Sequence, residues 1–207
     1  HSTDRRVEIA VELSNFYSAP IIRMTHVLPS SDDEIIIHKN TSKYITKELF
    51  ITKYSMDKWG YDSDVIPHGI DTNLFKNNNG ARLNQCLSVV NYWASRDWAC
   101  GWEFWNEAIK TKEIPFRVLG DNPGLSQPAR NERVLIEEYN KSSIFVNTSM
   151  NSPVPMSLLE AMSCGCAVLT TNNCEIPNFV EMYSLCKNEE EMSQKAKYMI
   201  NNPNYAN

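Results

Sequence analysis

Short, nearly continuous runs of apolar residues in the second half of the chain constrain its fold more than any other feature. Four such runs occur, at residues 86–93, 116–120, 143–149 and 166–171. Segments with a helical pattern separate them or follow them, at residues 101–110, 131–141, 157–163 and 188–200. Apolar runs without polar alternation are typical of strands covered on both faces, and strands that alternate with helices form parallel sheets. This half is therefore predicted to be an α/β domain.

The first half of the chain shows a partial unit of the same kind. Its pattern predicts a helix at 4–17, strands at 19–26 and 64–75, a loop at 28–34, and a strand followed by a short helix within 48–61. Ser55 is the expected cap of that short helix, and Pro67 and Gly69 are expected to close the last strand. The polar, turn-rich residues 76–81 are the best candidate for a linker. The expected domains are therefore residues 1–75 and 82–207.

Composition excludes several classes of protein. The chain has 207 residues and a formal net charge of −5, so a nucleic-acid-binding surface is not expected. No apolar run is long enough to span a membrane, and no signal peptide is expected from this sequence. The six cysteines lack CxxC spacing and the four histidines lack metal-ligand spacing, which favours reduced cysteines, a cytoplasmic protein and no metal. The first residue, His1, suggests a piece of a longer protein.

A single carboxylate, Glu160, stands in the helix predicted at residues 157–163, directly after the strand at 143–149. In a parallel α/β sheet, ligands bind beyond the carboxyl ends of the strands, where this helix begins. The first turn of a helix offers unpaired N–H groups and a positive dipole end to a phosphate. A carboxylate one turn further on repels phosphate but accepts hydrogen bonds from the vicinal hydroxyls of a ribose. This pattern indicates a nucleotide diphosphate site; the alternative is a solvated surface glutamate.

Residues 148–180, TSMNSPVPMSLLEAMSCGCAVLTTNNCEIPNFV, resemble the donor-binding segment of the family 4 type retaining glycosyltransferases, which have the GT-B fold. DVIPHGIDTNLF, FRVLGDNPG and VLIEEYNKSSIFVNTS resemble earlier segments of the same family, in the family's order. The resemblance runs from about residue 1 to residue 203. It implies GT-B type, Rossmann-like parallel sheets, with a partial amino-terminal domain and a reduced carboxyl-terminal domain that binds a nucleotide sugar.

The resemblance implies that Glu160 binds the donor ribose as the second carboxylate of the family's E-x7-E motif. The first carboxylate would fall at Ser152, and the next residue, Pro153, replaces a glycine that would offer an N–H group. Ser152 carries no charge but is still able to form one hydrogen bond with the donor sugar. The other residues of this segment expected to contact the donor are Ser149, Pro155, Met156 and Ser157.

A second departure from the family concerns positive charge. The family usually has an arginine after the first strand of this domain and a lysine before the next helix, and both neutralise the diphosphate leaving group. Here Ser95 and Cys100 stand at the aligned positions, and Arg96 is one residue away. Arg96 neutralises the diphosphate if the loop is shifted by one residue relative to the family. The alternative is a surface arginine paired with Asp97. A missing lysine would weaken the stabilisation of the leaving group.

The connection between the strand at 116–120 and the helix at 131–141 is also shorter than in the family, which usually has another helix and strand there. Arg130 and Arg133 in this region are expected to be surface charges, the alternative being contact with phosphate or base. Tryptophans also recur at helical spacing, at Trp98, Trp102 and Trp105, just after Trp93. Such a stripe favours core packing over stacking on a sugar or base.

The leading hypothesis is a retaining, hexosyl-type glycosyltransferase that moves a sugar from a nucleotide diphosphate donor to a hydroxyl acceptor (a sugar, glycan or lipid), without a metal or separate cofactor. His26 aligns with a histidine that faces the donor sugar in many relatives, so His26 and Ser152 are the predicted catalytic residues; the alternative for His26 is a strand-end histidine without a role. The rival hypothesis is a non-catalytic nucleotide-sugar-binding or scaffold domain. A weaker third hypothesis is a sugar-nucleotide epimerase.

Overall fold

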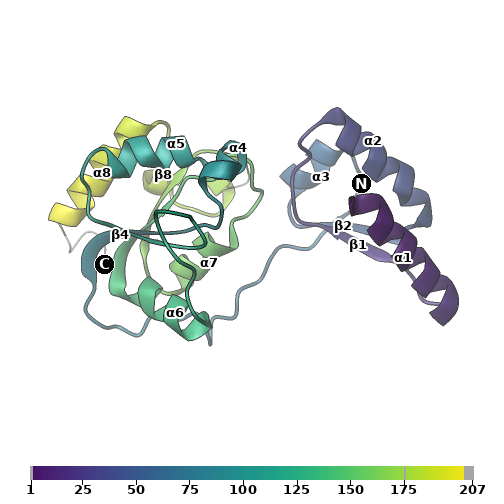
Figure 1. Ribbon diagram of the computed structural model, residues 1–207, viewed down its shortest axis with the longest axis horizontal. Helices are drawn as coiled ribbons and strands as arrows, with labels where there is room; N and C mark the ends of the chain where they lie inside the picture. Colours follow the sequence, from purple (N-terminus) through teal and green to yellow (C-terminus); the bar gives the residue numbers. More distant parts are fainter. Residues whose placement is uncertain (1, 175, 203–207) are drawn as a thin grey trace. The chain divides into compact units, whose positions relative to one another are not determined.

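The computed structural model describes residues 2–174 and 176–202 and divides the chain into two compact units. Unit 1 is His1–His68 and unit 2 is Gly69–Asn207. Each unit contains its own parallel β-sheet, of three strands in unit 1 and five in unit 2 (Figure 1). The predicted α/β class with two parallel sheets is therefore confirmed.

Unit 1 is a small parallel sheet with the strand order β1-β2-β3. Its strands are β1 (Ile22–Thr25), β2 (Lys47–Phe50) and β3 (Asp64–Val65). Its helices are α1 (Ser2–Tyr17), α2 (Asp32–Thr41), the 3-10 turn η1 (Ser42–Tyr44) and α3 (Lys53–Trp59). Phe50, Met56 and Trp59 form its buried apolar cluster. In Figure 1, α2 and α3 cover one face of this sheet, and α1 runs beside β1.

Three details of unit 1 differ from the sequence-based expectation. Residues 28–34, expected as a loop, include the start of α2, because the Ser31 side chain caps the helix by accepting a hydrogen bond from the Glu34 N–H. Thr52 rather than Ser55 caps α3, since the Thr52 hydroxyl accepts from the Ser55 N–H at 2.9 Å. The strand expected at 64–75 contains only the two residues of β3.

Unit 2 is a five-stranded sheet with the order β5-β4-β6-β7-β8, in which every neighbouring pair is parallel. Its strands are β4 (Leu83–Val89), β5 (Phe116–Leu119), β6 (Ser142–Asn147), β7 (Ala167–Thr171) and β8 (Leu185–Cys186). Its main helices are α4 (Asp97–Cys100), α5 (Trp102–Trp105), α6 (Glu132–Lys141), α7 (Met156–Ser163) and α8 (Glu189–Asn201). Short turns complete it: η2 (Ala94–Arg96), the π-helical η3 (Asn106–Lys110), η4 (Ile176–Asn178) and η5 (Met182–Ser184).

The sheet of unit 2 is covered on both faces, as its apolar strands predict. Helices α6 and α7 lie on one face, and α5 and α8 lie on the other (Figure 1). One buried cluster, which includes Trp105 and Ile144, fills the α5/α8 side, and a second, which includes Leu87, Tyr139 and Leu158, fills the α6/α7 side. All six residues of β6 are buried, so this central strand has no solvent-facing position.

Most elements of unit 2 were predicted within two or three residues of their bounds. Two predictions were wrong: β4 ends at Val89 instead of Trp93, and β8 was not expected. The segment at 76–81, expected as a linker, bonds within unit 2. Asn140 accepts from the Asn78 N–H, and its amide donates to the Lys76 carbonyl oxygen. The domain limits of 1–75 and 82–207 stay a prediction.

Candidate nucleotide-sugar site

The amino-terminal end of α7 lies after the carboxyl end of β6, as expected for a binding helix of a parallel sheet. Its N-cap is Pro155, whose side chain makes no capping hydrogen bond. The first backbone N–H groups of the helix, those of Met156 and Ser157, have no acceptor one turn earlier in the helix. In the described part of the chain the hydroxyl of Ser157 also lacks a partner. These groups could together receive an anion such as a phosphate.

Glu160 lies one turn into α7, half-buried, and it is not a solvated surface side chain. The buried Tyr139 of α6 donates a hydrogen bond from its hydroxyl to Oε2 of Glu160 at 2.6 Å. Burial raises the pKa of the Glu160 carboxyl, the hydrogen bond from Tyr139 lowers it, and the nearby Glu132 raises it. The sum is a pKa above the usual range of glutamate. No group of the described residues donates to the other oxygen, Oε1.

The sequence had no signal for the pairing of Tyr139 with Glu160. The spacing of Leu135, Ile136 and Tyr139 on α6 is the spacing of a helix face that packs on a sheet, and it predicts burial. The partner of the hydroxyl is 21 residues away, on the next helix. Only the packing of α6 beside α7 on one face of the sheet brings the two side chains together.

The loop between β6 and α7 carries the other donor-site candidates. The hydroxyl of Ser149 donates to the side chain of Asn147, and its carbonyl oxygen accepts from the hydroxyl of Thr171. Ser152 is half-buried, and its side chain has no hydrogen-bond partner among the described residues. Pro153 after it is buried. The hydroxyl of Ser152 is therefore not used by any of the described residues.

The segment with Arg96 is tied to this same loop. The carbonyl oxygen of Ala99 accepts hydrogen bonds from the N–H groups of Met150 and Asn151, and that of Cys100 accepts from the hydroxyl of Thr148. The structure thus brings the α4 segment and the β6–α7 loop to one end of the sheet. Arg96 is exposed at the end of η2.

The charges of this segment differ from those of an ordinary surface ion pair. Arg96 and Asp97 form no salt bridge. Oδ1 of Asp97 accepts a hydrogen bond from the N–H of Glu103 at 2.8 Å. Burial raises the pKa of the Cys100 thiol, and the nearby Arg96 lowers it by less. Cys100 is therefore neutral at pH 7 and supplies no positive charge where the resembling family has a lysine.

The tryptophans of the predicted stripe do not share one helix face. Gly101, with a φ of 63°, ends α4 and starts α5, so Trp98 belongs to a different helix from Trp102 and Trp105. Trp93, Trp102 and Trp105 pack in the α5/α8 core, with the rings of Trp93 and Trp105 4.7 Å apart. The prediction of core packing is confirmed for these three tryptophans, whereas Trp98 is 61% exposed.

The arginines of the short β5–α6 connection are surface groups. Arg133 pairs with Glu137, one helical turn away, and its side chain is 86% exposed. Arg130 is exposed as well. Between β5 and α6 the described chain has a turn closed by an isolated bridge between Asn122 and Ser126, in place of a helix and a strand.

His26 belongs to unit 1, where it follows β1. Its Nδ1 lies 3.3 Å from Nε2 of His68, and the two rings stack with centroids 5.0 Å apart. Burial, followed by the proximity of His26, lowers the pKa of His68, so His68 is neutral at pH 7. His26 is thus an exposed histidine at a strand end, in contact with a second imidazole. Its catalytic role stays a prediction.

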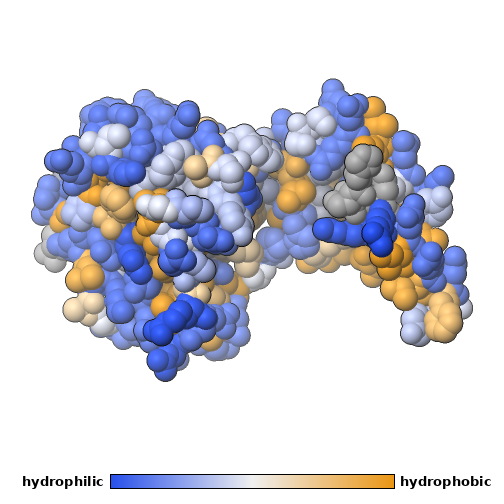
Figure 2. Space-filling model, in the orientation of Figure 1, coloured by the Kyte–Doolittle hydropathy of each residue, from blue (hydrophilic) through white to orange (hydrophobic). Residues whose placement is uncertain are grey.

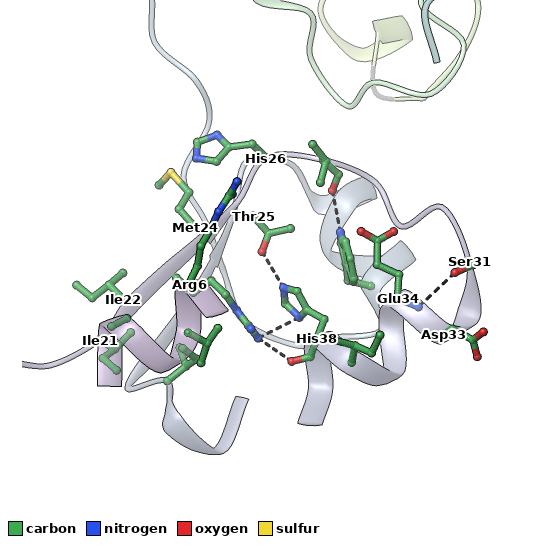
Figure 3. Close-up of a pocket in the computed structure, with 17 residues that line it drawn as sticks. Arg6, Ile21, Ile22, Met24, Thr25, His26, Ser31, Asp33, Glu34 and His38 are labelled. Carbon is green, nitrogen blue, oxygen red and sulfur yellow. Dashed lines mark hydrogen bonds between the residues drawn. The ribbon is translucent and has the colours of Figure 1, made fainter. Parts of the chain in front are cut away.

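A cavity of about 720 Å³ runs along β1 in unit 1. All seven residues from Ile21 to Val27 line it, and α1 and α2 flank it (Figure 3). His26 lies at its margin, and His38 lies in its wall, where it contacts Thr25 and Arg23. Apolar side chains of α1 and β1 are exposed in unit 1, among them Ile9, Leu13, Phe16 and Ile22. Figure 2 shows hydrophobic residues at the surface of this part of unit 1.

The second half of unit 2 matches a known protein family. Residues 127–207 match the family model described as glycosyl transferases group 1. The match includes β6, the loop with Ser152, and α7 with Glu160. The chain therefore contains a glycosyl transferases group 1 domain, as the motif in residues 148–180 predicts. No curated protein sequence matches the chain significantly.

Solved structures with a similar fold include three glycosyltransferases or synthases. HepE of Anabaena, solved with UDP-glucose, has a TM-score of 0.79 and 14% identity over 98% of this chain and 68% of its own. TarM of S. aureus has a TM-score of 0.68 and 11% identity over 91% of this chain and 45% of its own. Sucrose-phosphate synthase of Thermosynechococcus elongatus has a TM-score of 0.68 and 14% identity over 89% of this chain and 59% of its own. At these identities the likeness shows the GT-B fold.

Among the described residues, no helix is both long and apolar enough to cross a membrane. No group of three or more histidine, cysteine, aspartate or glutamate side chains among them is placed to hold a metal ion. All six cysteines lie in the described residues, and none forms a disulfide.

Proposed function

We propose that this chain is the donor-binding part of a retaining glycosyltransferase, which moves a hexosyl group from a nucleotide diphosphate sugar to a hydroxyl acceptor. The observation that carries the proposal is Glu160, a half-buried carboxylate one turn inside a helix whose first N–H groups have no side-chain cap. HepE, which has this fold, was solved with UDP-glucose, and that supports the proposal. This chain spans about two thirds of HepE, so the activity of a whole protein is part of the proposal.

In this proposal the first turn of α7 receives the diphosphate. The N–H groups of Met156 and Ser157 and the positive end of the helix dipole stabilise its charge by roughly 0.3–1 kcal/mol. The exposed Arg96 supplies a cation at the same end of the sheet. Ser149 and Ser152 provide hydroxyl groups on the side of the sugar. The catalytic role predicted for His26 is kept as part of the proposal. The carboxylate of Glu160 receives the ribose hydroxyls.

A second candidate function is nucleotide-sugar binding without transfer. Ser152 stands where the family has a carboxylate, and the neutral Cys100 stands where it has a lysine. Both changes remove charge that would stabilise the reacting sugar and the leaving group, while the ribose contact of Glu160 stays. A binding domain would need Glu160 and α7 but not the lost charges.

A cytoplasmic location stays a prediction, and the absence of disulfides supports it.

The test is calorimetric titration of the chain with UDP, GDP and ADP in the absence of divalent metal. We expect one of the three to bind, and Glu160→Ala to weaken that binding by about 1.5–3 kcal/mol, roughly ten- to over a hundredfold. Glu137→Ala, which removes an exposed carboxylate of α6, is the matched control. Equal affinity of Glu160→Ala and the parent would refute the ribose contact.

A second experiment separates the two candidate functions. Release of free sugar or its transfer to an acceptor is followed by chromatography, with the nucleotide sugar whose base binds best. Turnover that is absent in Glu160→Ala indicates a transferase. Binding of the nucleotide without turnover indicates the non-catalytic function.

A further inference from the structure

The hydrogen-bond partner of the candidate ribose-binding carboxylate is a buried tyrosine, Tyr139, which is not among the predicted site residues. Tyr139 lies on the inner face of α6, fully buried, in the core cluster with Leu158 and Ala161 of α7. Its ring also lies 5.8 Å from that of Phe145 in β6 and 6.3 Å from that of Phe75. The ring is therefore held on several sides, which fixes the position of the hydroxyl.

The chemistry of the pair decides which group donates. Burial raises the pKa of the Tyr139 hydroxyl, and the charge of Glu160 and the hydrogen bond to it raise it further. The hydroxyl is therefore protonated at neutral pH. It donates to Oε2 of Glu160 at 2.6 Å, a length typical of a hydrogen bond to an ionised carboxylate.

We propose that Tyr139 is a positioning residue of the nucleotide site: its hydroxyl holds one oxygen of Glu160 and leaves the other, Oε1, for the ribose hydroxyls. This inference rests on the proposed function of Glu160. A glutamate side chain has three rotatable bonds, and a bond from a fixed donor removes most of that freedom before the nucleotide arrives. The ribose then meets a carboxylate that is already in place.

The same hydroxyl keeps the carboxylate ionised. Besides Tyr139, the titratable groups that face Glu160 are Glu132 of α6 and Cys164 at the end of α7. Burial and Glu132 both raise the pKa of Glu160, and among its interactions the hydrogen bond from Tyr139 lowers it. The ribose donates its hydroxyl hydrogens, so it binds the ionised form. Loss of the tyrosine hydroxyl should therefore move the loss of binding on acidification to a higher pH.

The experiment measures the affinity for UDP-glucose by calorimetry between pH 4.5 and 8. The phosphates of this probe are both esterified, so its own charge stays constant over this range. Four proteins are compared: the parent, Tyr139→Phe, Glu160→Gln and Tyr61→Phe. Tyr61→Phe removes a partly buried tyrosine hydroxyl from unit 1, where it contacts His38 and Ser42, and so serves as the matched control.

We expect Tyr139→Phe to weaken binding at pH 8 about three- to tenfold and to raise the midpoint of its pH dependence by about 0.5–1 unit. Tyr61→Phe should behave as the parent. A carbon-13 NMR titration of the Glu160 carboxyl, without nucleotide, should show the same rise of its pKa in Tyr139→Phe. A role of Tyr139 in packing alone would not move either midpoint.

Two results would overturn the inference, and they differ from each other. If Glu160→Gln abolishes the pH dependence but Tyr139→Phe keeps the midpoint of the parent, Tyr139 only packs, and the function of Glu160 stands. If Glu160→Gln keeps both the affinity and the pH profile of the parent, Glu160 does not bind the ribose. The proposed contact and the role of Tyr139 then fail together.

Discussion

At the scale of single residues, a buried histidine in unit 1 shows how tertiary contacts set a protonation state. His38 of α2 is 6% exposed. Arg23, which can only donate, points a guanidinium N–H at Nδ1 of His38 at 3.0 Å, so this nitrogen accepts. The proton of the neutral ring therefore lies on Nε2, which is 3.1 Å from the hydroxyl of Thr25.

This environment predicts that unit 1 loses stability in acid. Burial and then Arg23 lower the pKa of His38 to about 4 from an ordinary value of 6.5. Between these values the unfolded chain binds a proton that the folded unit does not, so stability falls as the pH drops from 6.5 toward 4. We expect a loss of about 2 kcal/mol, measured by hydrogen exchange of the β1 and β2 amides at pH 7 and 4.5.

The control is His38→Gln, which does not titrate in this range. Its exchange should show a smaller pH dependence than that of the parent, whatever its stability at pH 7. The same acid dependence in both proteins would mean that other groups cause it.

At the scale of elements, Gly101 is the joint between two helices. It adopts a φ of 63°, ends α4 and starts α5. A Cβ atom at this position would overlap the carbonyl oxygen of Thr148, at the end of β6. The close approach of α4 to the β6–α7 loop therefore requires glycine, and this approach brings Arg96 to the candidate site.

We expect Gly101→Ala to destabilise unit 2 by about 3 kcal/mol, through the left-handed backbone and the overlap with Thr148 together. Urea unfolding followed by circular dichroism measures the loss. Gly124→Ala is the matched control, because Gly124 also has a positive φ, 78°, but nothing lies within 4 Å of an added Cβ. It should cost only about 1 kcal/mol. Equal losses in the two variants would show that the contact with Thr148 is unimportant.

At the scale of the whole molecule, each buried cluster draws its residues from one unit. Phe50, Met56 and Trp59 belong to unit 1, and the two larger clusters belong to unit 2. The stability of each unit should therefore respond to its own core.

Two core substitutions test this. Phe50→Ala should weaken protection against hydrogen exchange in unit 1 by about 3–5 kcal/mol, and Leu158→Ala should do so in unit 2 by about 2–5 kcal/mol. Both side chains are fully buried. Hydrogen exchange with mass spectrometry resolves the two units. Loss of protection in both units from either substitution would mean that they unfold as one.

The elements of unit 2 were predictable because their signals are local. The apolar run that forms β6, the cap of α6 at Asn131 and the glycine at 165 after α7 each act through neighbours in sequence. The prediction was wrong where a local signal was ambiguous, as at the acidic start of α2. It also missed the break at Gly101, because a glycine inside a helical pattern indicates a left-handed joint only when another backbone lies close to it.

The sequence by itself determined the α/β class, the parallel sheets and the family segment around Glu160, because periodicity and motif spacing are properties of neighbouring residues. Tertiary structure alone decided that Tyr139 bonds to Glu160, that Trp98 is exposed while Trp105 is buried, and that His38 is neutral. The physical reason is that burial, hydrogen-bond partners and protonation depend on side chains far apart in the chain. Those side chains meet only after the helices have packed on their sheets.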